Sequence, residues 1–392
     1  MQKRITAATC LVLLTAAIAS PNLAHACPFC SAPSLTLSEQ MAQADSVVLV
    51  KWVEGKKSDG KIPGSTTYEI VEVSKGSKAT LKPGKKIILT RFRPAKKGDL
   101  FLLMGSKSVN IEWGSPLEVT KASYQYISKA PNPEQPVQKR LVYFMKYLEF
   151  PDLLVSNDAY AEFANAPYKD IAAIADKMPR DRIRKWVASK ETPQTRLGLY
   201  GLMLGLCGKP ADAELMKKKI LAKSDDFRLG IDGVMSGYLL LTGEEGLEVL
   251  DEHKLDSSSK VPFSETYAAM QALRFLWTYS PKTVEKSRLR KSMRNLLKRP
   301  ELADLVIADL ARWKDWSIQD QLMKLYTKKE YNIPSIKRAI VRYMLVCAND
   351  KDEKSSNGKV PQHVLDARKN LAMLEKTDPK TVRNAKRFFF IK

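Results

Sequence analysis

Short runs enriched in apolar residues, with polar stretches between them, fill the chain between Ser46 and Ile127. Such runs, rich in Val, Ile, Leu and Tyr and separated by turn-forming stretches such as Lys82-Pro83-Gly84-Lys85, are typical of β-strands. A short helix is expected before them at residues 37–44, with Thr36 or Ser38 near its cap. Even spacing of short strands favours a small barrel, and an OB-like barrel is our first expectation. The strands are expected at residues 46–53, 66–74, 86–91, 99–105 and 123–127.

The pattern changes after the proline-rich residues 130–136, which we interpret as a stiff linker. From there to residue 392, apolar residues recur at three- and four-residue spacing, which predicts helices. The expected fold class is therefore α+β and multidomain: a small OB-like β-barrel over residues 27–129, then an α-helical repeat domain over residues 137–392. The first helices are expected at residues 137–148, 158–166, 168–177, 181–189, 195–207 and 211–222.

An internal repeat favours an array of helix pairs. The ten residues from Arg196 to Gly205 match those from Arg228 to Gly237 at six positions. In each copy the glycines fall at i, i+3 and i+7, so they share one helix face that a neighbouring helix can approach closely. A glycine destabilises a helix by up to about 1 kcal/mol relative to alanine, so a repeated glycine face implies packing that offsets this effect. The repeat resembles HEAT and other α-solenoid repeats, which implies an extended, curved surface.

Residues 1–26 have the three parts of a secretory signal peptide. Basic Lys3 and Arg4 precede an apolar stretch from Ala7 to Ala19, and Ala24-His25-Ala26 forms a small-residue cleavage site before Cys27. We therefore predict export, to the periplasm or out of the cell. A membrane anchor is the alternative, although the apolar run is shorter than the roughly 20 residues that span a bilayer. A cysteine after the cleavage site also raises the possibility of bacterial lipoprotein processing, in which this cysteine is lipidated. Ala24 and His25 disfavour such processing.

The net charge is strongly positive, +22 for the whole chain, and loss of the signal peptide removes only two of these charges. Such a charge suits anionic surroundings, such as an acidic envelope polymer or lipid headgroups. Nucleic acid would also attract this charge, but we do not expect it to be the partner. The alternative is that the charge serves solubility alone, because basic residues are spread over the whole mature chain. The mature chain has no predicted transmembrane span, although peripheral or lipid-anchored membrane association stays open.

Cys27-Pro28-Phe29-Cys30 is the most compact reactive motif of the sequence. Two thiols at this spacing can close a disulfide, take part in redox chemistry or bind a soft metal. Export to an oxidising compartment favours a disulfide that acts as a local staple or tether. The motif resembles the active site of glutaredoxin and thioredoxin-like proteins, but no strand precedes it here. Cys207 and Cys347 are predicted to be buried free thiols, and whether they pair stays open.

A second resemblance covers about residues 27–127. A cysteine at the mature N-terminus, a short helix and a barrel ending in a strand such as residues 97–105 resemble the netrin-like domain of tissue inhibitors of metalloproteinases. The resemblance implies protease inhibition through Cys27, whose amino group and carbonyl would chelate the target's zinc. The family pattern, however, is Cys-x-Cys with further cysteines in the barrel, and none occurs here between Cys30 and Cys207. The whole chain also resembles secreted bacterial HEAT-repeat proteins that begin with a Cys-x-x-Cys; this resemblance implies an architecture but does not indicate an activity.

Catalytic sequence motifs are missing. The sequence has no Gly-x-Ser-x-Gly, no P-loop and no His-Glu-x-x-His, so we predict no enzyme activity, no cofactor and no metal site. Residues 286–299 instead predict an amphipathic helix with a cationic face, for which a solvated outer face is the alternative. Two further groups combine aromatic and basic residues: Trp313 and Trp316, and residues 388–390 beside Lys386 and Arg387. Their aromatic rings could bind a polymer or could anchor the core of the terminal helices. The candidate anion-binding residues are Lys286, Arg288, Arg290, Lys291, Arg294, Lys298 and Arg299.

These patterns favour an exported, non-enzymatic binding or scaffold protein of the cell envelope. Its helical surface is expected to take a protein or a polyanionic partner. The alternatives are a thiol-redox or metal-linked role of Cys27 and Cys30, and protease inhibition through the N-terminal domain.

Overall fold

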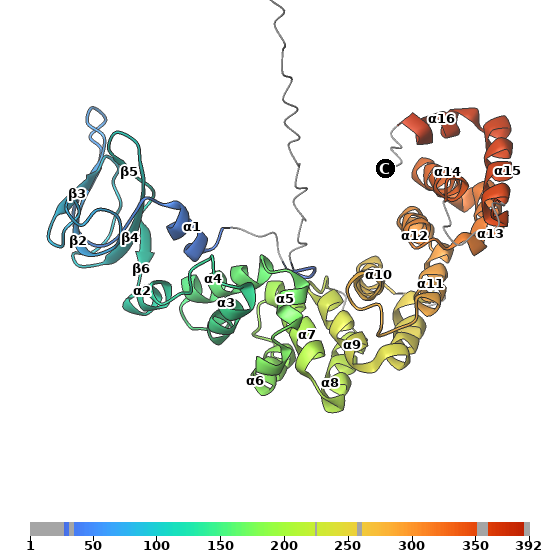
Figure 1. Ribbon diagram of the computed structural model, residues 1–392, viewed down its shortest axis with the longest axis horizontal. Helices are drawn as coiled ribbons and strands as arrows, with labels where there is room; N and C mark the ends of the chain where they lie inside the picture. Colours follow the sequence, from blue (N-terminus) through green and yellow to red (C-terminus); the bar gives the residue numbers. More distant parts are fainter. Residues whose placement is uncertain (1–26, 31–34, 224–225, 257–260, 351–359, 388–392) are drawn as a thin grey trace, which may run out of the picture.

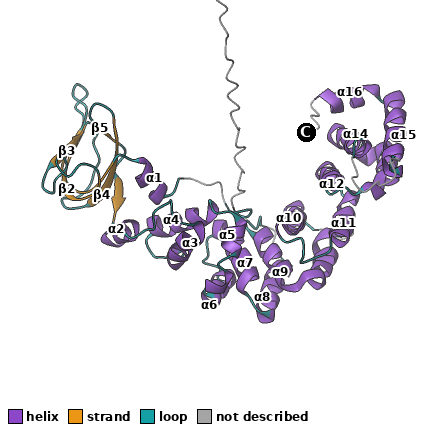
Figure 2. Cartoon of the chain, viewed as in Figure 1, coloured by secondary structure: helices purple, strands orange, loops and turns teal. Residues whose placement is uncertain are grey.

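The computed structural model describes residues 27–30, 35–223, 226–256, 261–350 and 360–387, so the predicted signal peptide and the last five residues lie outside the description. The described chain forms an arc, with a β-sheet at one end and a curved row of helices leading to α16 at the other (Figure 1). In the part of the chain that the structure describes, the short helix α1 comes first, the strands follow it, and the remaining helices come after the strands (Figure 2). The expected order of a barrel-like sheet followed by helices is therefore confirmed.

The sheet is antiparallel, and its neighbouring strands follow the order β3-β2-β1-β4-β5, with β6 paired to β4. It curls into a nearly closed barrel. Arg91, just after β3, donates hydrogen bonds to the carbonyl oxygens of Trp113 and Gly114 at the end of β5, so it bridges the two edges of the sheet. The strands are β1 (Ser46–Lys56), β2 (Ser65–Lys75), β3 (Lys86–Leu89), β4 (Leu100–Lys107), β5 (Ile111–Trp113) and β6 (Leu117–Val119).

Strand β1 is buried on both faces along its first half. Val48 and Val50 pack inside the barrel with Phe101. Val47 and Leu49 point the other way and join a second core that continues into the helices. Because side chains alternate across a strand, one run of four apolar residues, Val47 to Val50, serves two cores.

Four of the five predicted strands are confirmed, and the prediction of a strand at residues 123–127 is wrong. These residues lie in helix α2 (Lys121–Ser128). Tyr124, Tyr126 and Ile127 mimic a strand pattern, but Thr120 and Ser123 form a capping box in which each side chain bonds the other's backbone N–H, and this starts a helix. Strands β5 and β6 were not predicted, because three residues are too short a run to show alternation.

A buried carboxylate joins the sheet region to the helices. Asp158 of α4 (Leu153–Ala164) accepts hydrogen bonds from the backbone N–H of Leu37, the first residue of α1 (Leu37–Gln43), and from the hydroxyl of Tyr126, both at 2.7 Å. Burial raises the pKa of Asp158 to about 6, against the opposing effect of these two hydrogen bonds. The carboxyl group therefore fixes α1 and α2, which flank the sheet, onto the first helices of the arc.

The helical region contains each of the six helices that the periodicity predicts at its start. Helix α4 begins five residues earlier than expected, because Asp152 caps it by accepting a hydrogen bond from the N–H of Leu154 at 3.0 Å. The proline-rich residues 130–136 end at Pro136, which precedes α3. The remaining α-helices in the described residues are α3 (Val137–Phe144), α5 (Tyr168–Ala172), α6 (Arg180–Ala188), α7 (Gln194–Cys207), α8 (Pro210–Leu221), α9 (Ile231–Leu250), α10 (Phe263–Tyr279), α11 (Lys286–Asn295), α12 (Pro300–Arg312), α13 (Gln319–Thr327), α14 (Pro334–Ala348), α15 (Gln362–Thr377) and α16 (Pro379–Arg387).

The two repeated glycine faces pack directly against each other. A Cβ atom added at Gly201 of α7 would lie 2.6 Å from the Cα of Val234 in α9, and one added at Gly205 would overlap Gly237. Only glycine permits this approach, since real Cβ atoms do not come so close to backbone. The sequence predicted a close helix contact, and the structure identifies its partner as the second copy of the same motif.

The glycine contact makes a testable prediction. Gly201→Ala should destabilise the protein by about 2 kcal/mol or more, because the overpacked methyl group must separate α7 from α9. This loss should occur although alanine favours the helix itself by about 1 kcal/mol. Urea unfolding of the variant measures the change. The exposed Ser287→Ala in α11 is the control, with an expected change within about 0.5 kcal/mol. An unchanged or higher midpoint for Gly201→Ala would contradict the contact.

Candidate functional site

The Cys27–Cys30 motif is a disulfide that lies against the middle of the arc, next to the helices. The two sulfur atoms are bonded, and the backbone N–H of Cys27 donates to the carbonyl oxygen of Ala164 in the last turn of α4 at 3.1 Å. The ring of Phe29 lies 5.1 Å from that of Phe275 in α10. A Cβ at Gly198 of α7 would be 2.7 Å from the carbonyl oxygen of Phe29. The motif therefore fastens the start of the described chain to α4, α7 and α10.

The backbone groups of this motif already have partners within the protein. Cys27 is 6% exposed, its N–H bonds Ala164, and its carbonyl oxygen accepts from the N–H of Cys30 at 3.4 Å. The same amino group and carbonyl are the groups that the netrin-like resemblance assigns to zinc chelation. As placed here, they support the structure of the helical region.

Within the described residues, Cys207 and Cys347 are free thiols; Cys347 is buried, as predicted, whereas Cys207 is only partly buried. Burial raises the pKa of Cys207 to about 11 and that of Cys347 to about 12, so both stay protonated and poorly nucleophilic at neutral pH. Among the described residues, no group of three or more His, Cys, Asp or Glu side chains is placed to hold a metal ion.

The arginines of the predicted cationic face lie in α11 and the turn after it, and each one bonds another part of the protein. Arg288 binds the carboxylate of Asp251 at 2.7 Å, and Arg294 binds both carboxylate oxygens of Asp315 at 2.6 Å. Two further arginines bond elsewhere: Arg290 donates to the carbonyl oxygen of Trp313 at 2.9 Å, and Arg299 pairs with Glu301 at 2.8 Å.

The lysines of the same face have a different environment. Lys286, Lys291 and Lys298 are exposed, and none of them forms an ion pair with a described carboxylate. The ammonium group of Lys286 lies 5.0 Å from the centre of the Trp277 ring. Of the seven candidate residues, these three lysines are the ones that present their charge to the outside.

Trp313 and Trp316 are anchored within the helical region. Trp313 is buried and stacks on Trp277 with ring centres 4.4 Å apart. The indole N–H of Trp316 donates to Asp350 at 2.7 Å. Both rings therefore act as core anchors, the second of the two roles that the sequence allowed. The aromatic residues 388–390 lie outside the described residues.

Buried arginine–carboxylate pairs recur along the arc and join residues roughly one helix pair apart. Arg180 pairs with Asp212 at 2.7 Å, Arg228 holds Glu265, and Arg274 bonds Asp309 at 2.7 Å. The partners are 32, 37 and 35 residues apart in sequence. A planar guanidinium can satisfy a buried carboxylate through two hydrogen bonds, which a lysine cannot match in geometry.

Glu265 illustrates how these pairs control ionisation. Burial alone would raise its pKa, but hydrogen bonds from Arg228 and Lys254 hold the pKa of Glu265 below its usual value. Arg228 also donates to the carbonyl oxygens of Lys219 and Ile220 at the end of α8, at 2.7 and 3.0 Å. The arginine therefore links three consecutive helical segments, and its charge is internally neutralised.

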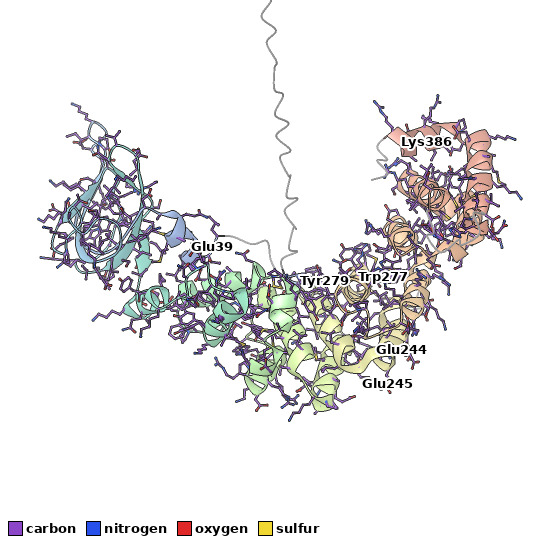
Figure 3. The ribbon with its side chains drawn as sticks, in the orientation of Figure 1. Glu39, Glu244, Glu245, Trp277, Tyr279 and Lys386 are labelled. Atoms are coloured by element: carbon purple, nitrogen blue, oxygen red, sulfur yellow. A yellow bond between two sulfur atoms is a disulfide. The ribbon has the colours of Figure 1, made fainter. Side chains whose placement is uncertain are left out.

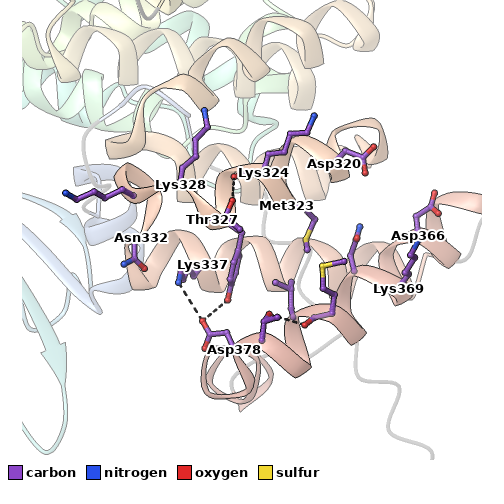
Figure 4. A pocket seen from close by; sticks show the side chains of 16 residues that line it. Asp320, Met323, Lys324, Thr327, Lys328, Asn332, Lys337, Asp366, Lys369 and Asp378 are labelled. Atoms are coloured by element: carbon purple, nitrogen blue, oxygen red, sulfur yellow. Dashed lines mark hydrogen bonds and ion pairs between the residues drawn. The ribbon is translucent and has the colours of Figure 1, made fainter.

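A cavity lies near the end of the arc, between α13 and α15 (Figure 4). Its volume is about 1050 Å³, and one face of each of these helices lines it, together with Lys337 of α14. Met323 and Leu374 give it an apolar part. Five lysines and three aspartates supply its charges: Lys324, Lys328, Lys329, Lys337, Lys369, Asp320, Asp366 and Asp378.

The acids and lysines of this cavity are unevenly paired. Asp378 lies 3.8 Å from the ammonium group of Lys337 and accepts a hydrogen bond from the hydroxyl of Tyr326 at 3.0 Å. Burial would raise its pKa, but hydrogen bonds from Thr381 and Tyr326 hold the pKa of Asp378 below its usual value, so it remains an anion. The other four lysines are exposed, and no described carboxylate lies within ion-pair distance of them.

A smaller hollow of about 520 Å³ extends the lysine-lined surface toward α11. Lys324 and Lys328 line both cavities, and Lys298 lines the smaller one. One of the predicted anion-binding residues thus belongs to a larger lysine-lined surface. The sequence did not identify this surface, because its lysines come from three different helical segments and show no pattern in any one of them.

Loss of the disulfide is expected to lower the stability of the folded protein and to leave the charges on its surface unchanged. Cys30→Ser should lower the free energy of unfolding by about 2 kcal/mol, the value expected for a closed loop of this size. Thermal unfolding with and without a thiol reductant measures the effect. The reductant should lower the midpoint of the wild-type protein and leave that of Cys30→Ser unchanged; equal midpoints for oxidised wild type and variant would contradict a stabilising role.

Comparisons with known proteins give no match. No protein-family model, no curated protein and no solved structure matches the chain. Within the described residues, no helix combines the length and apolar character needed to cross a membrane.

Proposed function

We propose that this protein is an exported, non-enzymatic binding protein of the cell envelope that captures a polyanionic partner on its lysine-lined surface. In this proposal an OB-like barrel is joined to a HEAT-like helical array, and the array supplies the binding surface. Residues 1–26 direct export to the periplasm or the outside, with lipid anchoring as the alternative.

The architecture supports the two parts of this proposal. The pairing of β1 with both β2 and β4, and of β2 with β3, follows the strand neighbours of an OB barrel, with Arg91 bridging the remaining gap. In the helical part, Arg196 and Arg228 occupy the same position in the two sequence copies. Each of them donates to carbonyl oxygens of an earlier segment and to a carboxylate, as expected for equivalent repeats.

The division of charge between arginine and lysine carries the functional proposal. The arginines along the arc are largely neutralised by buried carboxylates, whereas Lys298, Lys324, Lys328, Lys329 and Lys369 gather at adjoining cavities without an ion-pair partner among the described residues. Exposed, strongly hydrated ammonium groups suit repeated, non-directional contacts with a polymer of phosphates or carboxylates.

The two rival functions have less support from the geometry. A thiol-redox role needs a reactive thiolate, but Cys27 is buried and bonded to Cys30, and the free cysteines have raised pKa values. Protease inhibition through Cys27 needs backbone groups that here bond to Ala164 and Cys30.

Charge reversal at the cavity tests the proposal. Lys324, Lys328 and Lys369 replaced together by Glu should weaken binding of long-chain inorganic polyphosphate by about tenfold or more, because three exposed attractive charges become repulsive. Binding is measured by titration at several salt concentrations, and wild-type affinity should fall as salt rises.

The matched control makes the same charge change on the sheet region. Lys78, Lys96 and Lys97 are exposed there, and replacing all three by Glu should change the affinity less than about twofold. Equal losses in the two triple variants would mean that net charge alone attracts the polymer. Affinity that does not depend on salt would contradict an electrostatic site.

A further inference from the structure

An apolar groove of about 390 Å³ runs between α12 and α14. Ala308 of α12 and Ala339 of α14 line it with small side chains, and Leu305, which also lines it, is 38% exposed. Along α14 the lining runs from Ser335 to Val346, which is about 16 Å, or three turns of helix. The groove therefore has the length for several large apolar side chains in a row.

Positive charge prevails at this groove. Arg338 is half-buried, and no hydrogen bond or ion pair joins it to a described residue, whereas Arg274 and Arg294 are each held by a buried carboxylate. A guanidinium group withdrawn from water without a partner is unfavourable, so the groove favours a ligand that brings carboxylates. The charged residues that line the groove are three arginines and one aspartate: Arg312, Arg338, Arg342 and Asp304.

The other two arginines also have charge available to a ligand. Arg312 pairs with Asp309 of its own helix at 2.8 Å, but its side chain is 72% exposed, and such surface pairs contribute little. The Nε–H of Arg342 donates to the carbonyl oxygen of Ala385 in α16 at 3.4 Å, and no described carboxylate lies within ion-pair distance of it. Together with Arg338 these groups suit several carboxylates, whereas a fatty acid would supply only one.

The walls of the groove determine the form of the ligand. Both walls are helices, whose backbone groups bond within the helix, so an extended peptide would find no backbone partners along them. A helical peptide bonds its own backbone, and apolar residues on one of its faces can fit between the side chains of α12 and α14. These two helices lie on the inner side of the arc, whereas α13 and α15, which carry the lysine-lined cavity, lie on its outer side (Figure 1).

We propose that the groove between α12 and α14 binds an acidic amphipathic helix of another protein, with its apolar face on Ala308 and Ala339 and its carboxylates on Arg338 and Arg342. This site is separate from the lysine-lined surface, so the two can be occupied at once. The inference does not rest on the proposed capture of a polyanion.

Fluorescence anisotropy with designed peptides tests this proposal on the full-length chain. The probe is a labelled helical peptide of about 14 residues with leucines along one face and glutamates beside them. One control peptide has lysines in place of the glutamates, and the other has the composition of the probe in scrambled order. The protein should bind the probe at least about tenfold more tightly than either control. Equal affinity for the probe and the scrambled peptide would overturn the proposal, because net charge alone would then explain binding.

Two variants locate the bound peptide. Arg338→Glu should weaken probe binding about tenfold and strengthen binding of the lysine peptide, since it reverses the charge at the groove. Ala308→Trp should weaken binding at least as much, because the indole fills the groove. Arg368→Glu on the exposed side of α15 is the matched control, with an expected change within about twofold. Unchanged probe affinity in either groove variant would overturn the proposal.

Two further measurements exclude other sites and other occupants. With Lys324, Lys328 and Lys369 replaced by Glu, probe affinity should stay within about threefold at 0.15 M salt, where charges more than about 8 Å apart are largely screened. A loss as large as that of Arg338→Glu would place the peptide on the lysine-lined surface and overturn the proposal. Binding only after removal of residues 388–392, or only at concentrations too low for self-association, would mean that the chain's own end or a second copy occupies the groove, and would also overturn it.

Discussion

The contact between α7 and α9 determines how the middle of this protein is assembled. Because glycines face glycines, the two helix backbones approach to distances that a single methyl group would prevent. The same face of α7 accommodates Phe29 over Gly198, and this allows the N-terminal disulfide segment to reach Phe275 in α10. Farther along the chain, Asp158 holds α1 against α4. The α7–α9 pair and the disulfide segment thus share one glycine face of α7.

Charge in this protein is divided by residue type. Guanidinium groups bind buried carboxylates across successive helix pairs, as in Arg180–Asp212, Arg228–Glu265 and Arg274–Asp309. A buried ion pair contributes little net stability, because desolvation opposes the Coulomb attraction, but losing one partner leaves an uncompensated buried charge. These pairs therefore fix how consecutive helices sit more than they stabilise the chain overall. Lys254, which is buried against Glu265, is an exception among the lysines, whereas Lys298, Lys324, Lys328, Lys329 and Lys369 are exposed, where hydration favours their ammonium groups and they give the surface positive charge.

The sequence predicted those features that depend on local patterns. Short runs rich in Val, Ile, Leu and Tyr between turn signals identified β1 to β4, three-to-four spacing identified the first helices, and the repeated glycines indicated a close helix contact. The strand expected at 123–127 failed because the capping box at Thr120 overrides an aromatic pattern that looks extended. The sequence could not reveal the internal partners of the arginines among the candidate anion-binding residues, for a different reason. Arg288 and Arg294 looked free on a helical projection, but Asp251 and Asp315 come from other segments that only the fold brings near.

Native-state chemical footprinting tests most directly the claim that arginines are committed internally while lysines face outward. The protein is treated in parallel with an arginine-directed dicarbonyl reagent and an amine-acylating reagent, folded and in denaturant, and peptides are quantified by mass spectrometry. Arg228 and Arg274 should react more slowly in the folded protein, because their guanidinium groups are mostly covered and hydrogen-bonded to buried carboxylates. Lys324, Lys328 and Lys369 should react at nearly the same rate in both states. Arg228 and Arg274 reacting as freely as in denaturant, or the three lysines being protected, would contradict this division of charge.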